Sequence, residues 1–491
     1  MILGLSGSRT AVRIVKGKHA ISTDIGYKHA GNKAERASRL PLEWLIPEAM
    51  MPSTKEDVVQ NFPHISGFFM ERELTITEPS ASDVVAKMST REWTALEVAK
   101  ATCNQTAVAQ QLLNCTSILT NSKPIGPLHG LPISLKDQFN LEGVESTIGY
   151  VGWAGRKPEE ESTLIKLLQK AGAVFYVKTN VPTTLMTCET VSNLFGRTVN
   201  PRNRKLTTEG SSGGEPALVT FRGSFVGIGN DVGGSIRHPA SYTGLYALRP
   251  SHGRVSYQQV TTTFLGQEAV QSSAGPLCRS PEDIRLLTKS LAAQEAWECD
   301  PQVIPLPWRA EAEMLRKKLC FGFGMGDGYV TPSPPLRRAM TITKKKLLAA
   351  GHNVIDFVPY QTKEASGIIW KMWLADGAEE IRRDSALSGE PLPPNTRIKP
   401  LGVFEMWQNQ HRRTILGRRF LERWQRTSED TGTGTGRPID GLIMPSTAMP
   451  AIRHDTRPPW NYSVLSPVLD LATGVFPVTK VDLEKDVIPD D

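Results

Sequence analysis

The sequence lacks the features that would point to a secreted, membrane-spanning or nucleic-acid-binding protein. Its six cysteines are scattered and form no C-x-x-C pair, so neither a disulfide framework nor a zinc site is predicted. There is no apolar run of about 18 residues and no signal peptide, so we predict no membrane span and no secretion. The net charge of +7 is modest for this length, and no basic stripe with interleaved aromatic residues stands out, so nucleic-acid binding is not predicted.

The composition is that of a globular protein, with 22% charged and 39% hydrophobic residues in a chain of 491. Residues 1–40 differ, because they carry eight Lys or Arg residues and only two acids, Asp24 and Glu35. We predict a poorly ordered basic extension there and a single domain over residues 41–491. The two acids count against a mitochondrial presequence, so a cytoplasmic location is expected, with mitochondrial targeting as the alternative.

Two glycine-flanked serine sites organise the segment from Thr207 to Pro239. Ser211 and Ser212 stand in EGSSGGE, and Ser235 stands in DVGGSIR, 24 positions after Ser211. The residues between them predict a turn, a helix, a strand and a second turn. Glycine lets backbone N–H groups approach a small ligand and converge on one point, as an oxyanion hole requires. One such run is usually an ordinary loop, but two runs around one helix favour a catalytic site.

A lysine on an apolar strand precedes these turns. Leu131, Ile133 and Leu135 alternate along one face of the predicted strand, and Ser134 and Lys136 lie on the other face. Lys136 has two interpretations, a salt-bridged or edge-strand lysine, which the strand alone favours, and a catalytic base. A base must be uncharged, which near neutral pH requires a fall of about 3 units in the lysine pKa, or roughly 4 kcal/mol. Burial among apolar neighbours can lower the pKa that far.

Helical and strand patterns alternate through residue 248, which predicts an α/β domain with a largely buried sheet. Helices are predicted at 163–172, 281–292 and 336–350, with two more within 80–111, and strands at 174–177, 352–358 and 442–444. In the pair within 80–111, we expect Ser82–Asp83 to cap the first helix and Ser89–Thr90 to begin the second. Trp370, Met372 and Trp373 are interpreted as core residues and not as a binding cage.

Polar residues near the serines are given structural interpretations. Ser212 completes the pattern G-x-S-x-G, but a nucleophile elbow needs a strand directly before it, and residues 200–209 predict a polar loop. We therefore expect Ser212 to cap the helix that follows. Asp231 and Arg237 are expected to fix the second turn by hydrogen bonds, and His238 to be a packing or surface residue.

Together these segments resemble the amidase signature family, in particular its fungal acetamidase-like branch. The resemblance covers roughly residues 40–482 and is carried by GPLHGLPISLKDQ (126–138), KTNVP (178–182), LFGRTVNP (194–201), EGSSGGE (209–215), NDVGGSIRHPA (230–240), SHGRV (251–255), DGLIMPSTAMP (440–450) and FPVTKVD (476–482). It implies an α/β fold in which helices wrap a mixed central β-sheet in a single large domain. It also implies hydrolysis of a small carboxamide without metal or organic cofactor, and it allows a homodimer.

The resemblance assigns roles to individual residues. Ser235 is the implied acyl nucleophile, Ser211 the bridging serine and Lys136 the base that ends the relay. The implied oxyanion donors are the backbone N–H groups of Val232, Gly233, Gly234 and Ser235. Leu185 and the 440–450 strand are the implied walls of the substrate pocket. Gly210 precedes Ser211 through an implied cis peptide bond.

The chain departs from the family pattern in four places. Glu209 stands where a glycine usually precedes the paired serines, and a carboxylate facing Lys136 would keep the lysine charged. Asn230 stands where threonine is usual. Only about ten residues separate Cys115 from Gly126, where the family has a longer segment with a helix. The family also continues for several dozen residues past FPVTKVD, so a truncated C-terminal end and an unpaired sheet edge are predicted.

Two alternative functions stay open from the sequence. The first is a truncated or inactive relative that has the motif without catalysis. The second is a subunit like that of a tRNA-dependent amidotransferase, which shares the catalytic core. The matches at 440–450 and 476–482 count against the second alternative.

Overall fold

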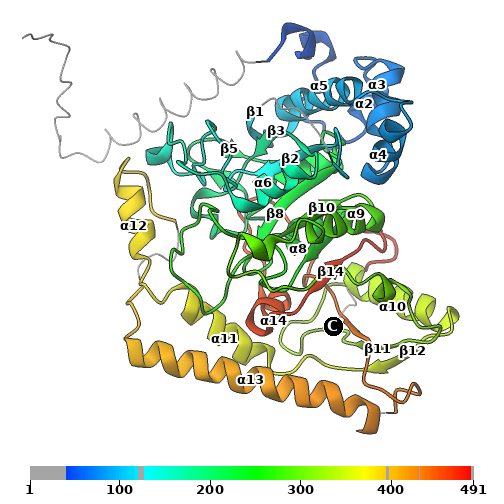
Figure 1. The fold of residues 1–491 in the computed structure, drawn as a ribbon, viewed down its shortest axis with the longest axis vertical. Helices are drawn as coiled ribbons and strands as arrows, with labels where there is room; N and C mark the ends of the chain where they lie inside the picture. Colours follow the sequence, from blue (N-terminus) through cyan, green and yellow to red (C-terminus); the bar gives the residue numbers. More distant parts are fainter. Residues whose placement is uncertain (1–39, 120–125, 394–397, 431, 488–491) are drawn as a thin grey trace, which may run out of the picture.

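The computed structural model describes residues 40–119, 126–393, 398–430 and 432–487. The predicted basic extension over 1–40 therefore lies outside the described residues except for Leu40. Most of the shortened segment between Cys115 and Gly126 lies outside them too. Within the described residues, helices surround a seven-stranded sheet (Figure 1).

The main sheet has the strand order β1-β3-β2-β8-β10-β9-β14. Its strands are β1 (Thr116–Leu119), β2 (Pro132–Lys136), β3 (Val174–Thr179), β8 (Val226–Asp231), β9 (Tyr246–Arg249), β10 (Ser273–Cys278) and β14 (Thr473–Val475). β2 runs parallel to β3 and to β8, whereas the other neighbouring pairs are antiparallel. The mixed central sheet expected from the sequence is confirmed.

β2 lies in the interior of this sheet, between β3 and β8. Every residue of β2, β3, β8 and β10 is buried, as expected for strands that are covered on both faces. Ile133, Leu135, Phe175 and Ile228 belong to one hydrophobic cluster. The interpretation of Lys136 as an edge-strand lysine is therefore wrong.

The helices between residues 62 and 292 cover the main sheet directly or pack on the helices that cover it. They are α2 (Phe62–Ile65), α3 (Glu71–Thr77), α4 (Ala81–Ser89), α5 (Ala95–Leu113), α6 (Thr163–Lys170), α7 (Gly214–Thr220), α8 (Arg237–Thr243) and α9 (Pro281–Ala292). α5 and α7 contact β2, and α9 contacts β10. The helices predicted at 163–172 and 281–292 are confirmed. The first is amphipathic and buries Leu164, Leu167 and Leu168.

The caps of α4 and α5 differ from the predicted ones. Ser80 accepts the N–H of Asp83, and Thr94 accepts the N–H of Glu97, and each completes a capping box. The N–H and hydroxyl of Ser82 donate instead to Oδ1 of Asp283, at 3.0 and 3.2 Å. The prediction of Ser82–Asp83 as a cap was wrong because Asp83 is the third helical residue, where it closes the box begun by Ser80.

The second half of the chain adds a three-stranded parallel sheet of order β12-β11-β13. The helices and strands from residue 320 to residue 469 are β11 (Cys320–Phe323), α10 (Pro334–Ala349), β12 (Asn353–Asp356), α11 (Thr362–Trp373), α12 (Glu379–Ala386), α13 (Val403–Asp430), β13 (Gly441–Ile443) and α14 (Asn461–Leu469). The long helix α13 packs against α11 and α14 (Figure 1). No helix in the described parts of the chain combines the length and the apolar character that crossing a membrane requires.

An aromatic cluster joins α11 to the residue before α14. The rings of Trp370 and Trp460 stack at 5.5 Å, and Trp373 meets Trp460 edge-on at 6.1 Å. Val232, which follows β8, packs in the same hydrophobic cluster as Trp373. This packing brings the second half of the chain against the turn that carries Ser235.

Candidate active site

Lys136 is the last residue of β2, and its side chain is fully buried. Its Nζ lies 2.7 Å from Oγ of Ser211 and also hydrogen-bonds Oδ1 of Asn230. Nδ2 of Asn230 donates to the hydroxyl of Tyr257 at 2.8 Å, and that hydroxyl also accepts from Nε2 of Gln138 at 2.7 Å. The amine is therefore held between a serine hydroxyl and an amide whose own orientation is fixed.

The surroundings of Lys136 favour its neutral form. Burial lowers the pKa of Lys136 well below its ordinary value, and the charges of Asp231, Glu215 and Asp137 oppose this shift only in part. Burial also raises the pKa of Glu215 to about 8, although two hydroxyls hydrogen-bond its carboxylate. Glu215 therefore opposes the shift at Lys136 less than a carboxylate with an ordinary pKa would.

Ser211 and Ser212 lie on the turn between β7 (Asn203–Thr207) and α7, and the Gly210–Ser211 peptide bond is cis. Ser212 is fully buried. Its N–H donates to the carbonyl of Ser235 at 3.2 Å, and its hydroxyl donates to the carbonyl of Asn230 at 3.3 Å. The prediction that Ser212 caps α7 is wrong, because its side chain is used to tie the two serine turns together.

Asp231 and Arg237 fix the second turn. The guanidinium of Arg237 donates from Nε and from Nη2 to the two carboxylate oxygens of Asp231, both at 2.9 Å, and both side chains are buried. Burial alone would raise the pKa of Asp231, but the paired guanidinium outweighs it and holds that pKa well below its ordinary value. Asp231 also accepts the N–H groups of Gly234 at 2.7 Å and Ile236 at 3.2 Å. The carboxylate of Asp231 therefore fixes the conformation of this turn through hydrogen bonds to its backbone.

The hydrogen bonds to Asp231 determine which backbone N–H groups of the turn remain available to a ligand. The N–H of Gly234 is already engaged by Asp231, so the expectation that Gly234 donates to an oxyanion is wrong for this conformation. The N–H groups of Val232, Gly233 and Ser235 form no hydrogen bond with another described residue. Ser463 of α14 donates its hydroxyl to the carbonyl of Gly233 at 2.6 Å, which holds the loop in place.

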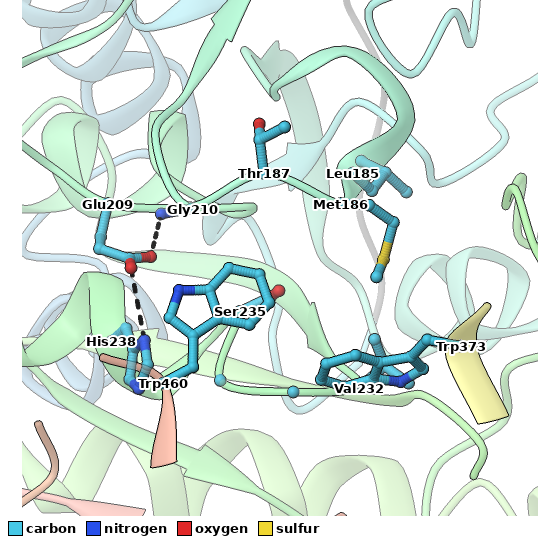
Figure 2. Close-up of a pocket in the computed structure, with 12 residues that line it drawn as sticks. Leu185, Met186, Thr187, Glu209, Gly210, Val232, Ser235, His238, Trp373 and Trp460 are labelled. Carbon is cyan, nitrogen blue, oxygen red and sulfur yellow. Dashed lines mark hydrogen bonds and ion pairs between the residues drawn. The ribbon is translucent and has the colours of Figure 1, made fainter. Parts of the chain in front are cut away.

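A small cavity with an empty volume of about 300 Å³ opens beside this turn (Figure 2). Its lining residues are Leu185, Met186, Thr187, Glu209, Gly210, Val232, Gly233, Gly234, Ser235, His238, Trp373 and Trp460. Of the three residues expected to act in catalysis, Ser235 lines the cavity, whereas Lys136 and Ser211 are buried behind the lining. The Ser235 hydroxyl forms no hydrogen bond with any residue that the structure describes.

The walls of this cavity correct two expectations. Trp373 belongs to the core, as predicted, but it also lines the cavity together with Trp460, which no local pattern had singled out. The 440–450 strand does not line it. β13 pairs with β11 in the second sheet, and Ile443 faces a different hollow beside α8 and α10. The only feature of the sequence that pointed to these aromatic walls was the pair of tryptophans at 370 and 373.

Glu209 and His238 form the polar end of the cavity. Both side chains are buried, and Nδ1 of His238 lies 3.5 Å from Oε1 of Glu209 (Figure 2). Oε2 of Glu209 accepts the N–H of Gly210 at 2.5 Å. Glu209 therefore pairs with His238, and it is not among the charges that act on Lys136. Of the two expectations for His238, the surface position is wrong, because the side chain is buried.

The fold is shared with solved structures of amide-hydrolysing proteins. The chain superposes on fatty acid amide hydrolase with a TM-score of 0.85 and 29% sequence identity, covering 93% of this chain and 84% of that one. It also superposes on a bacterial aryl acylamidase of the amidase signature family, with a TM-score of 0.67 and 20% identity over 83% of this chain and 91% of that one. The second likeness concerns the fold alone.

Sequence comparison makes the assignment specific. The family model described as Amidase matches residues 83–490. A protein named "Putative amidase kk1C" from Curvularia clavata is 55% identical over 480 residues, which are 93% of this chain and 87% of that protein. An acetamidase of Emericella nidulans is 42% identical over 482 residues, 92% and 86% of the two chains. The chain therefore belongs to the amidase signature family of amide-hydrolysing enzymes.

Proposed function

We propose that this enzyme is a serine amidohydrolase that cleaves small carboxamides to a carboxylate and ammonia through an acyl-enzyme on Ser235. The observation that carries the proposal is the 2.7 Å contact between the buried amine of Lys136 and the hydroxyl of Ser211. The relatives named amidase and acetamidase support an amide as the substrate. Ser235 is the nucleophile in this proposal because it lines the cavity and its hydroxyl is unengaged by any described residue.

A serine hydroxyl is a weak nucleophile until a base takes its proton. In the proposed path, Ser235 passes its proton to Ser211 as it attacks the amide carbon, and Ser211 passes its own proton to the neutral amine of Lys136. Asn230 supports this path because its amide oxygen orients the amine without adding a charge. An uncharged acceptor keeps the pKa of Lys136 low, as a base near neutral pH requires.

The negative oxygen of the tetrahedral intermediate needs fixed donors. The unengaged N–H groups of Val232, Gly233 and Ser235 are the candidates among the described residues, and the Asp231–Arg237 pair keeps their turn rigid. When the intermediate collapses, the C–N bond breaks and protonated Lys136 returns a proton through Ser211 to the leaving nitrogen. Water then attacks the ester on Ser235 by the same proton path and releases the carboxylate.

The cavity supports a small acyl group. Leu185, Met186, Trp373 and Trp460 provide apolar walls beside Ser235. Burial of a few methylene groups against such walls contributes about 0.8 kcal/mol each to binding. A short aliphatic or a compact aromatic carboxamide is the expected substrate class.

Two alternative functions would give different experimental results. A relative without catalysis would unfold cooperatively and release no ammonia from acetamide or benzamide. An amidotransferase-like subunit would co-purify with a larger tRNA-binding partner. A homodimer and a cytoplasmic location remain predictions from the sequence.

The proposal is tested by ammonia release from acetamide and benzamide by the wild-type enzyme and by Ser235→Ala. We expect the wild type to turn over at least one amide, and Ser235→Ala to lose at least about 10⁴-fold in kcat. Thermal unfolding of both proteins controls for loss of the fold. A Ser235→Ala variant with the wild-type rate would overturn the assignment of the nucleophile.

A further inference from the structure

The hydrogen bonds around Asn230 determine how its side-chain amide points at Lys136. An asparagine amide can present either its oxygen or its NH2 group to a neighbour, and its partners decide between the two. Here Oδ1 faces Nζ of Lys136, and Nδ2 donates to the hydroxyl of Tyr257 at 2.8 Å. Asn230 is buried, so other side chains must supply these partners. The orientation of the amide therefore depends on Tyr257.

The orientation matters because a neutral lysine amine has two N–H donors and a single lone pair. As a base, Lys136 accepts the proton of Ser211 with that lone pair, and Oγ of Ser211 lies 2.7 Å from Nζ. With Oδ1 towards the amine, the amide of Asn230 accepts one N–H and leaves the lone pair to Ser211. If the amide turned over, its NH2 group would donate to the lone pair. The lysine would then be neutral and yet unable to accept a proton.

A second amide favours the acceptor role of the Tyr257 hydroxyl. Nε2 of Gln138 donates to this hydroxyl at 2.7 Å and to the carbonyl of Thr261 at 3.2 Å. A backbone carbonyl only accepts hydrogen bonds, so Thr261 fixes which end of the Gln138 amide faces Tyr257. The phenol oxygen thus accepts from Gln138 and from Asn230. The side chain of Ser272 lies beside the phenol and can accept its proton.

We propose that Tyr257 is a positioning residue for the base, which orients the Asn230 amide so that the lone pair of Lys136 stays free. The proposal rests on the proposed function, in which Lys136 accepts the proton of Ser211. Tyr257 does not belong to the described lining of the cavity that contains Ser235. It therefore acts through the amide and not on the substrate.

The charges that act on Lys136 come from residues other than Tyr257. Among the described residues, they are those of Asp137, the next residue in the chain, Glu215 of α7 and Asp231 at the end of β8. Burial raises the pKa of Tyr257 to about 12, so the phenol is uncharged near neutral pH. Replacing Tyr257 by phenylalanine therefore removes a hydrogen-bond partner and changes no charge near the amine.

The test is the pH dependence of kcat/KM for ammonia release from acetamide or benzamide by Tyr257→Phe. The variant keeps the ring and removes the partner of Nδ2 of Asn230, so the two orientations of the amide come closer in energy. An amide NH2 group that donates to Lys136 stabilises the neutral amine and also occupies its lone pair. We expect the plateau of the profile to fall about tenfold and its acidic limb to move to lower pH by about one unit.

Further variants show whether Tyr257 acts through Asn230. Asn230→Thr has no amide to orient, so adding Tyr257→Phe to it should leave the acidic limb in place. Tyr176→Phe is the matched control, because it removes another buried phenol, bonded to the carbonyl of Gly223, and should not move the limb. If Tyr257→Phe is inactive or does not unfold cooperatively, Gln138→Leu takes its place. A phenol released from Gln138 can donate to the amide, so a smaller shift in the same direction is expected.

Each outcome decides between the proposals. An acidic limb of Tyr257→Phe at the wild-type position or at higher pH overturns the positioning role, and so does an equal shift in the Asn230→Thr background. A loss of rate without a shift is the result expected of a merely structural residue. Failure of the wild type to release ammonia from either amide overturns the proposed function instead. A limb at lower pH that disappears in the Asn230→Thr background supports the role of Tyr257.

Discussion

Asn230→Asp tests whether Lys136 acts as an uncharged base. Oδ1 of Asn230 hydrogen-bonds Nζ of Lys136, and Nδ2 donates to the hydroxyl of Tyr257. Aspartate has the same shape, and the Tyr257 hydroxyl can turn its proton towards the new oxygen. The substitution thus adds a carboxylate at hydrogen-bond distance from the amine with little change in packing. An opposite charge at that distance favours the protonated lysine.

The size of the effect follows from that charge. A carboxylate within about 4–6 Å shifts the pKa of a cationic partner by about 1–3 units, so we expect the pKa of Lys136 to rise by about 2 units. At a pH below the pKa of Lys136 in the wild type and in the variant, the neutral fraction of the lysine is about 100-fold smaller in the variant, equivalent to roughly 2.7 kcal/mol. Because a base must be neutral, the rate is lost at low pH and returns as the pH rises through the raised pKa.

The assay is the pH dependence of kcat/KM for ammonia release, which reports the pKa of the essential base in the free enzyme. We expect the acidic limb of the Asn230→Asp profile to move to higher pH. Asn230→Thr removes the amide without adding charge, so its limb should not move in that direction. A loss of rate that is the same at every pH, or an Asn230→Asp limb that coincides with that of the wild type, would refute the neutral-lysine role.

Three further substitutions test other parts of the site. Lys136→Met should lose at least about 100-fold in rate at neutral pH and keep a cooperative thermal transition, and retention of the wild-type rate would contradict its role. Arg237→Met removes both guanidinium hydrogen bonds to the buried carboxylate of Asp231 and leaves only Arg249, whose Nε lies 4.0 Å from Oδ1, so denaturant unfolding should show a loss of about 3 kcal/mol, and a loss below about 1 kcal/mol would be inconsistent with the pairing. Ser212→Ala should lose about 1 kcal/mol of stability and retain acylation of Ser235, and abolished acylation would point to a chemical role.

The elements of the main sheet could be predicted from the sequence because their side-chain periodicity is local. The alternation of Leu131, Ile133 and Leu135 located β2 and placed Lys136 on the opposite face. The amphipathic pattern over 163–172 located α6 in the same way. The glycine-flanked serines marked the two turns because few other residues permit such close backbone approach. The alternation of side chains could not show that β2 lies inside the sheet. Only the fold shows this interior position, and it excludes the edge-strand interpretation of Lys136.

The cavity was less predictable, because its walls come from segments that are distant along the chain. Trp460 reaches the site through stacking on Trp370, and no local pattern reports that contact. The pairing of His238 with Glu209 was not predicted, because Glu209 lies on the other serine turn. The hydroxyl of Ser212 could have capped a helix or bridged two turns, and only the fold places the carbonyl of Asn230 within its reach. Gly234 was expected to donate to an oxyanion, but the partner of its N–H depends on where Asp231 points.

The central claim is that the reactive hydroxyl of this enzyme belongs to Ser235. A fluorophosphonate probe reacts with an activated serine, and peptide mapping then identifies the labelled residue. We expect one label, on Ser235, and much slower labelling in Lys136→Met. A label on Ser211 or Ser212, or on a serine outside the cavity, would contradict the account.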